Sequence, residues 1–288
     1  MPANTPFPTL REEYLRKKRN RKLLKYGLFL LLAVLIIGIF GYVAHRPELN
    51  ISKIVLTGGV LVTQQDIASQ SFEYMQGSYL WIFPVSNSLL YPKSQLASYL
   101  MENFPRIESI RMHLQDFHTL SIDITERKPV ATWCRTVSAS DGKMEDGSTT
   151  EECYFLDQNS TIFAKAPNFS GDAYFKFYGL VDALDPIGIS YIASTSRFAE
   201  IVSFIDEVRK LSLDPQYLVA NSADDFSLVV GGGGQIFFDT KKPLSDIAGN
   251  LEALLRTPAL STSTTHNLPV QYIDLRYGNK LFYKLKNQ

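Results

Sequence analysis

An uninterrupted apolar segment near the amino terminus constrains this chain most. It runs from residue 26 to residue 44, YGLFLLLAVLIIGIFGYVA, and its nineteen residues include no charged side chain. A helix with a rise of ~1.5 Å per residue would carry it across roughly the ~30 Å hydrocarbon core of a bilayer. The segment is apolar on every side, whereas a helix of a soluble core keeps a polar face. We therefore expect a transmembrane helix over residues 26–44.

Positive charge lies directly before this segment. Eight of the fifteen residues from Arg11 to Lys25 are lysine or arginine, against two glutamates. A basic flank of a membrane span stays in the cytoplasm. We expect residues 1–25 to form a basic cytoplasmic tail, residues 46–288 to lie outside, and the lipid bilayer to be a partner.

Two other interpretations of this region fit less well. A cleaved signal peptide has a shorter apolar stretch, and YVAHRP offers a poor small-residue cleavage site. The run RKKRNRK could contact nucleic acid, but orientation and contact with anionic lipid explain it more simply beside a membrane span. Because the formal net charge is zero, the chain has no long-range attraction to nucleic acid, and we expect no such partner.

The two cysteines, Cys134 and Cys153, both belong to the expected external part. An oxidising compartment favours a disulfide between them, worth ~3 kcal/mol if unstrained. The alternative is two buried free thiols. The polar sequence between them favours the disulfide. Two cysteines at this spacing with no histidine nearby make a poor metal site, so we expect neither a metal nor a cofactor.

The first external stretch, residues 50–128, alternates strand and helix patterns. ISKIVLTGG alternates like a short strand, TQQDIASQSFEYM opens with a capping pattern, and YPKSQLASYLMENFP has a helical apolar face. GSYLWIFPV, between the two helices, is interpreted as an apolar connector. Two alternating segments follow, IESIRMHLQ and TLSIDITE. The order β-α-α-β-β predicts a small α+β domain with two helices on one face of a three-stranded sheet.

The remaining stretch, residues 129–288, contains many short strand patterns. Two segments, STSRFAEIVSFIDEVRKL and PLSDIAGNLEALLR, have apolar residues at helical spacing. We expect a second domain, a twisted sheet with packed helices. The predicted fold class is α+β: an amino-terminal transmembrane helix, a β-α-α-β-β domain and a β-rich domain.

Motifs for catalysis are weak. The run from Gly231 to Gly234 leads into a strand pattern rather than a helix, so it indicates a hairpin turn and not a phosphate loop. No histidine stands at metal-ligand spacing from another, and no paired carboxylates stand out, although a triad can assemble from distant positions. We expect no catalytic residue and no enzyme activity.

Two segments indicate contacts. QYIDLRYGNKLFYK, residues 271–284, has two alternating runs around Gly-Asn, which predicts a β-hairpin or a bulged bend. An uncovered last strand is a liability unless it is a docking site. In TERKPVATW, Glu126 and Arg127 precede Pro129 at the end of a strand, which fits either a solvated strand end or a joint where an ion pair fixes two domains.

The chain resembles the FtsQ/DivIB cell-division family. The resemblance rests on ISKIVLTGGVLVTQQDI, NFPRIESIRM, ITERKPVATW and YIDLRYGNKLFYK, which follow one another in the family's order behind the membrane anchor. It implies a POTRA domain at 50–128, a β domain at 129–288 and a joint between them.

The same resemblance implies a scaffold of the bacterial division machinery, located at the septum. Such proteins join the bitopic proteins FtsB and FtsL, help to regulate septal peptidoglycan synthesis, and contact further components through the POTRA domain. Family members receive a strand from an FtsB-like partner at their last strands. Carried over to this sequence, the partner-binding residues are Tyr277, Asn279, Lys280, Leu281, Phe282, Tyr283 and Lys284.

The sequence departs from the family in its insertion between the cysteines, its long glycine run and the segment GLVDALDPIG. An alternative function is that of a POTRA-type envelope protein in polypeptide transport or assembly. Such proteins usually continue into a membrane β-barrel, whereas about 160 residues with two clear helices follow here. A membrane-anchored cell-wall enzyme is a third possibility, and it would need a pocket of titratable residues.

Overall fold

The computed structural model describes residues 10–137, 150–167, 173–258, 260, 270–278 and 280–286. They form two compact units, the first made of residues 1–100 and 110–124 and the second of residues 101–109 and 125–288. The architecture is the expected mixture of a long apolar helix, a small sheet with helices and a large sheet with helices. The domain boundaries expected from the sequence stay a prediction.

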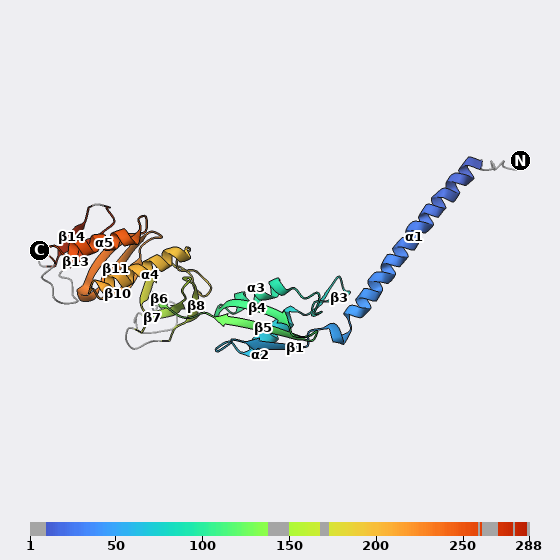
Figure 1. Cartoon of the computed structure of the whole chain (residues 1–288), viewed down its shortest axis with the longest axis horizontal. Helices are drawn as coiled ribbons and strands as arrows, with labels where there is room; N and C mark the ends of the chain where they lie inside the picture. The colour runs from blue at the N-terminus through green and yellow to red at the C-terminus, as the bar shows by residue number, and fades with distance from the viewer. Residues whose placement is uncertain are drawn as a thin grey trace. The chain divides into compact units, whose positions relative to one another are not determined.

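A single helix of the described chain is long and apolar enough to cross a membrane. This helix, α1 (Leu10–Ala44), continues from the basic segment into the apolar one without a break, and its stretch from Arg16 to Ala44 meets that requirement (Figure 1). The apolar side chains along it are largely exposed. Exposed apolar surface of this extent suits lipid rather than water.

The small sheet of the first unit has the order β1-β5-β4, with β1 parallel to β5. Thr63 caps the first of the two helices after α1, since its hydroxyl accepts a hydrogen bond from the Asp66 N–H at 3.2 Å. Ile67, Leu96 and Leu120 are fully buried in its core. The elements are η1 (Pro47–Leu49), β1 (Lys53–Thr57), α2 (Gln64–Tyr74), α3 (Lys93–Asn103), β4 (Ile107–Leu114) and β5 (Thr119–Glu126).

The interpretation of GSYLWIFPV as a connector is wrong. This segment contains a short antiparallel hairpin, β2 (Ser78–Tyr79) paired with β3 (Phe83–Pro84). Strands of two residues are too short to show an alternation in the sequence, and Pro84 argues against a strand interior.

The second unit is built on a nine-stranded sheet with the order β14-β13-β12-β11-β10-β9-β6-β7-β8. Its strands are β6 (Ala131–Val137), β7 (Thr150–Leu156), β8 (Ile162–Lys165), β9 (Lys176–Gly179), β10 (Pro215–Ala220), β11 (Asp225–Val230), β12 (Gly234–Asp239), β13 (Val270–Asp274) and β14 (Phe282–Leu285). Parallel pairs join β6 to β9, β9 to β10 and β12 to β13. The last two strands therefore belong to the same sheet as the first ones.

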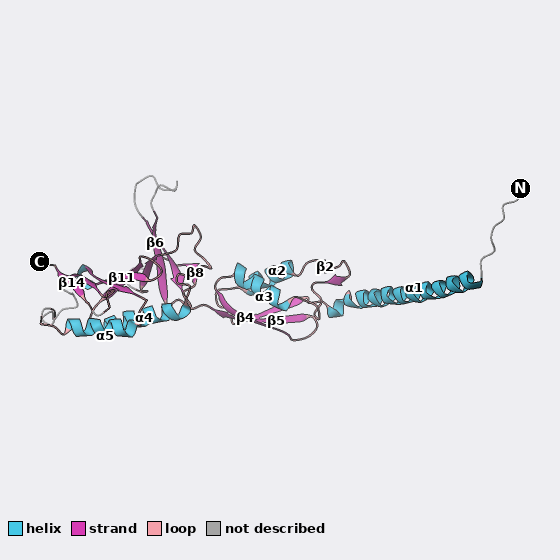
Figure 2. Ribbon diagram, turned by 90° about the horizontal axis from the view of Figure 1, so that it is seen from above, coloured by secondary structure: helices cyan, strands magenta, loops and turns pink. Residues whose placement is uncertain are grey.

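Two helices cover one face of this sheet, α4 (Thr195–Lys210) and α5 (Leu244–Leu255) (Figure 2). The apolar side chains between these helices and the sheet are mostly buried, and the rings of Phe204 of α4 and Phe238 of β12 lie tilted against each other with their centres 4.7 Å apart. The glycine run turns the chain between β11 and β12, where Gly232 and Gly233 have positive φ angles of 77° and 80°. That is a conformation glycine adopts at little cost.

Candidate functional site

Strand β14 forms one edge of the nine-stranded sheet. It pairs with β13 in antiparallel register, Phe282 opposite Asp274 and Lys284 opposite Tyr272, and no described strand lies on its other side. Since side chains alternate along a strand, Phe282 and Lys284 lie on one face and Tyr283 on the other. The residues from Phe282 to Lys284 are exposed. The edge therefore offers both backbone hydrogen-bonding groups and aromatic side chains to a partner.

The turn between β13 and β14 is held by Arg276. Its guanidinium donates to both carboxylate oxygens of Asp274, at 2.9 and 2.6 Å, and to Asp225 of β11 at 2.9 Å. It also lies 5.2 Å from the centre of the Phe237 ring. The Asp274 carboxylate accepts a further hydrogen bond from the backbone N–H of Arg276 at 3.1 Å. These contacts fix the turn against the sheet and leave the neighbouring Tyr277 side chain outside it.

The charges of this cluster stabilise one another. Burial alone would raise the pKa of Asp274, but the hydrogen bonds and positive charge of Arg276 outweigh it and hold that pKa below its ordinary value. The hydrogen bonds to Asp274 raise the pKa of Arg276. Asp274 is therefore an ionised structural carboxylate at neutral pH and is not poised to exchange protons.

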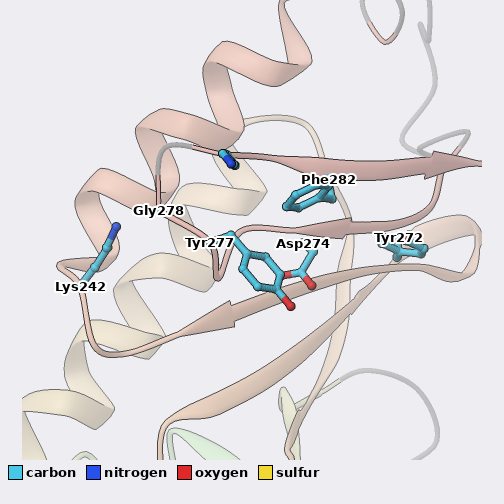
Figure 3. A pocket seen from close by; sticks show the side chains of 7 residues that line it. Lys242, Tyr272, Asp274, Tyr277, Gly278 and Phe282 are labelled. Atoms are coloured by element: carbon cyan, nitrogen blue, oxygen red, sulfur yellow. The ribbon is translucent and has the colours of Figure 1, made fainter.

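An open hollow of about 840 Å³ lies beside this turn (Figure 3). Tyr277 is 61% exposed and meets Phe282, 48% exposed, edge to face with ring centres 5.3 Å apart. Lys242 approaches from the loop before α5, and its ammonium lies where a side chain on Gly278 would begin. The hollow thus joins aromatic surface to positive charge. It is lined by Lys242, Tyr272, Asp274, Tyr277, Gly278, Lys280 and Phe282.

Most residues of the predicted binding segment lie at this edge. Tyr277, Lys280 and Phe282 line the hollow, and Tyr283 and Lys284 are exposed on β14. Leu281 packs against the core and serves the fold of the unit. Asn279 lies outside the described residues.

Sequence reasoning missed Lys242 and Tyr272. Lys242 precedes α5, about thirty residues before the hairpin, and the parallel pairing of β12 with β13 returns the chain to it. A lone lysine in a loop gives no signal of this approach. Tyr272 could have been found, because it stands in the same alternating run as Asp274.

The predicted joint residues have contacts of their own within the second unit. Arg127 forms an ion pair with the nearly buried Asp157 and donates from Nε to the Pro105 carbonyl at 2.9 Å. Glu126 is the last residue of β5, and Pro129 follows in the segment before β6. The partner of Arg127 is thus 30 residues away in the sequence. A role for these residues in fixing two domains stays a prediction.

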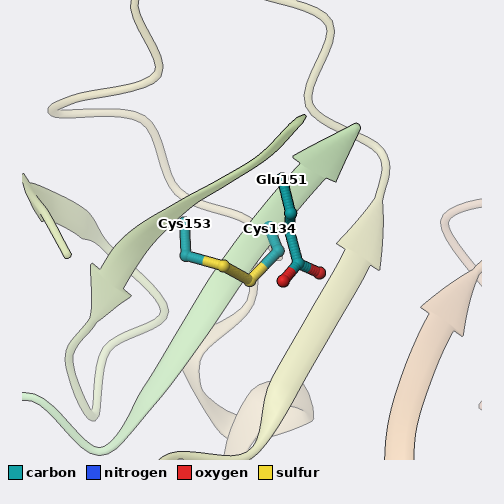
Figure 4. Close-up of side chains that lie close together, drawn as sticks. All are labelled: Cys134, Glu151 and Cys153. Atoms are coloured by element: carbon teal, nitrogen blue, oxygen red, sulfur yellow. A yellow bond between two sulfur atoms is a disulfide. The ribbon is translucent and has the colours of Figure 1, made fainter. Parts of the chain in front are cut away.

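Cys134 and Cys153 face each other across β6 and β7 and are joined by a disulfide bond (Figure 4). The Glu151 carboxylate lies within 4.8 Å of both sulfurs. Because the sulfurs are bonded to each other, they are not the thiolates that bind metals. Glu151 is also engaged, since it accepts hydrogen bonds from Lys176 and Tyr178, and these hold its pKa below the ordinary value.

Comparison with known proteins identifies a distant relative. The chain is 23% identical over 231 residues to the cell division protein FtsQ of Mycobacteroides abscessus, a match that covers 80% of this chain and 64% of that protein. The matched part is thus less than two thirds of the relative's length. No family model matches the chain. The match supports membership in the FtsQ family, which the sequence motifs had indicated.

Proposed function

We propose, from this distant similarity to FtsQ, that the chain is a bitopic scaffold of the bacterial divisome that binds an FtsB-like or FtsL-like protein by strand addition at β14. The observation that carries the proposal is the outer side of β14, on which no strand of the described residues pairs, next to a hollow with exposed aromatic rings. Such a scaffold helps to regulate septal peptidoglycan synthesis without being a catalyst itself.

The proposed orientation follows from charge. The basic tail of residues 1–25 stays in the cytoplasm, and residues 46–288, which hold the part of the first unit after α1 and the whole second unit, lie outside, at the division septum. Contacts with other division proteins through the first unit complete the scaffold role. The disulfide between Cys134 and Cys153 is compatible with an oxidising external compartment.

In this binding mode, backbone hydrogen bonds provide affinity and side-chain contacts provide selectivity. An added strand would satisfy the outward N–H and C=O groups of β14. Tyr277 and Phe282 are exposed and would supply the central apolar contacts, because aromatic residues are enriched at the cores of protein interfaces. Lys242, Lys280 and Lys284 lie around or on this edge, so the partner strand is expected to carry acidic residues.

Site-specific photo-crosslinking in cells tests this function. A photoreactive amino acid replaces Phe282, and a matched probe replaces Leu184, a residue of the second unit that is 94% exposed and does not line the hollow. We expect Phe282 alone to crosslink to a small single-pass membrane protein. Crosslinks to nascent or exported chains would instead support the polypeptide-transport alternative. Equal crosslinking from both positions would contradict the proposed site.

A further inference from the structure

The tip of the β2–β3 hairpin exposes two large apolar side chains. Trp81 is 95% exposed and Leu80 is 81% exposed, although both residue types are usually buried. They occupy the central positions of a turn closed by the hydrogen bond from the Ile82 N–H to the Tyr79 carbonyl at 3.0 Å. The fold of the first unit does not explain this exposure.

The backbone at the tip is unfavourable for these residues. Leu80 and Trp81 have positive φ angles of 49° and 65°. A hairpin turn of this kind favours Asn-Gly or Asp-Gly, because bulky side chains pay a conformational cost there. The sequence therefore places a large apolar pair where a polar pair would fold better. Strain of this kind is typical of a functional contact.

The hairpin lies beside the end of the membrane-spanning helix. A side chain added at Gly41 of α1 would meet Ile82 at 2.6 Å, so the helix and the hairpin are in close contact. The Asn87 amide donates to the Ala44 carbonyl at 3.0 Å. The backbone of residues 49–51 is bonded to the segment after the hairpin, from Ser88 N–H to the Leu49 carbonyl at 2.8 Å.

These contacts place the tip at the depth where the apolar segment ends. Gly41 and Ala44 belong to the last turn of α1, and the first charged side chain after the span is Arg46. No charged residue occurs from Tyr74 to Pro92, which contains the hairpin. Uncharged aromatic surface at this level suits the boundary between headgroups and acyl chains, where tryptophan and tyrosine concentrate.

We propose that the β2–β3 hairpin inserts Leu80 and Trp81 into the outer boundary of the bilayer and is a second membrane contact of the chain. The burial of these two side chains in lipid offsets the cost of their backbone conformation. The part of the first unit that follows α1 is then attached to the membrane both by α1 and by the hairpin, which limits its rotation about the end of the helix. This inference does not depend on the partner of β14.

Tryptophan fluorescence of the reconstituted full chain tests the proposal. The chain has two tryptophans, and Trp133 is buried with its indole N–H donating to the Gly179 carbonyl at 2.9 Å. The difference between the wild type and Trp81→Phe isolates the emission of Trp81. Vesicles of phosphatidylethanolamine and phosphatidylglycerol include lipids brominated on acyl-chain carbons near the headgroup.

We expect the Trp81 emission to be blue-shifted and to be quenched by the brominated lipid. Iodide on either side of the membrane should not quench it. Leu184→Trp in the Trp81→Phe background is the matched control, expected to be quenched by iodide and not by the lipid. Quenching of Trp81 by iodide without loss to brominated lipid would overturn the proposal. Insensitivity to both quenchers would also overturn it, because Trp81 would then be covered by protein.

Discussion

The hairpin of the first unit and the hairpin at the edge of the second unit both expose aromatic side chains, but their surroundings differ. The β2–β3 hairpin lies in a stretch without charge and contacts the end of a membrane-spanning helix. The β13–β14 hairpin is fixed by an arginine with two carboxylates and is bordered by lysines, and the outer side of β14 is not paired with any strand that the structure describes. Exposed apolar area alone does not identify what covers it. The charges around the apolar surface and the backbone groups beside it indicate the partner. They favour lipid at the β2–β3 hairpin and a polypeptide strand at the β13–β14 hairpin.

The largest effect is expected from Arg276→Ala, which removes the fixed turn from only one of the two hairpins. It leaves Asp274 and Asp225 without their counter-charge, and Asp274 is nearly buried. Because the pairs are partly exposed, we expect a loss of ~2–3 kcal/mol in the free energy of unfolding of the second unit. Urea denaturation of the full chain in detergent measures it.

Arg256→Ala is the matched control, since Arg256 forms an exposed i,i+4 ion pair with Glu252. Its expected cost is at most about 0.5 kcal/mol. A similar small loss for Arg276→Ala would show that the cluster does not hold the edge.

A smaller effect of opposite sign is expected when Leu80 and Trp81 are replaced by Asn and Gly. The new pair suits the positive φ angles of the turn. We therefore expect the first unit to gain ~0.5–1 kcal/mol in detergent while the membrane contact of the hairpin is lost. Thermal unfolding of the full chain in detergent measures the change in stability. Protease digestion of the chain in lipid vesicles measures whether the membrane still protects the hairpin. A loss of stability would mean that Leu80 and Trp81 are packed against protein.

The smallest effect concerns pH and again separates the two hairpins. The folded state holds the pKa of Asp274 below its ordinary value of 3.8, so the folded chain binds fewer protons than the unfolded chain around that pH. The stabilisation is fully present above this value and is lost as the pH falls below it. We expect Asp274→Asn to reduce the pH dependence of unfolding below about pH 4.

No carboxylate or histidine lies between Tyr74 and Pro92. The lipid quenching of Trp81 should therefore stay constant over the acid range in which the edge weakens. A parallel change of both signals would mean that the two hairpins do not respond independently.

Local patterns in the sequence predicted the elements that depend on local physics. The apolar spacing of α4, the cap at Thr63 and the alternation of β4 and β5 each follow from residues close in the chain. The β2–β3 hairpin was missed because its strands are two residues long and its turn carries Leu80 and Trp81 instead of Asn-Gly. The sequence signal for such a turn was absent.

The candidate site was predictable only where its residues are consecutive. The aromatic residues Tyr277 and Phe282 stand in one run, and their exposure follows from their place at the end of an alternating segment. Lys242 lies near them because β12 pairs in parallel with β13. Asp225 reaches Arg276 because β11 lies close to β13 in the order of the sheet. Pairing between distant strands is set by the packing of the whole sheet and not by local propensity.

The parallel pairing of β1 with β5 has a mechanical consequence. After α1 the chain enters the small sheet at the start of β1 and leaves it at the end of β5, and residues 53–57 pair with residues 119–123 in parallel. Tension between the span and the second unit would therefore pull the two strands in opposite directions along their axes. All the hydrogen bonds of the pair would then be loaded in shear together, instead of opening one after another. A pair of strands connected in this way can transmit a force from the membrane anchor without losing its hydrogen bonds one by one from one end.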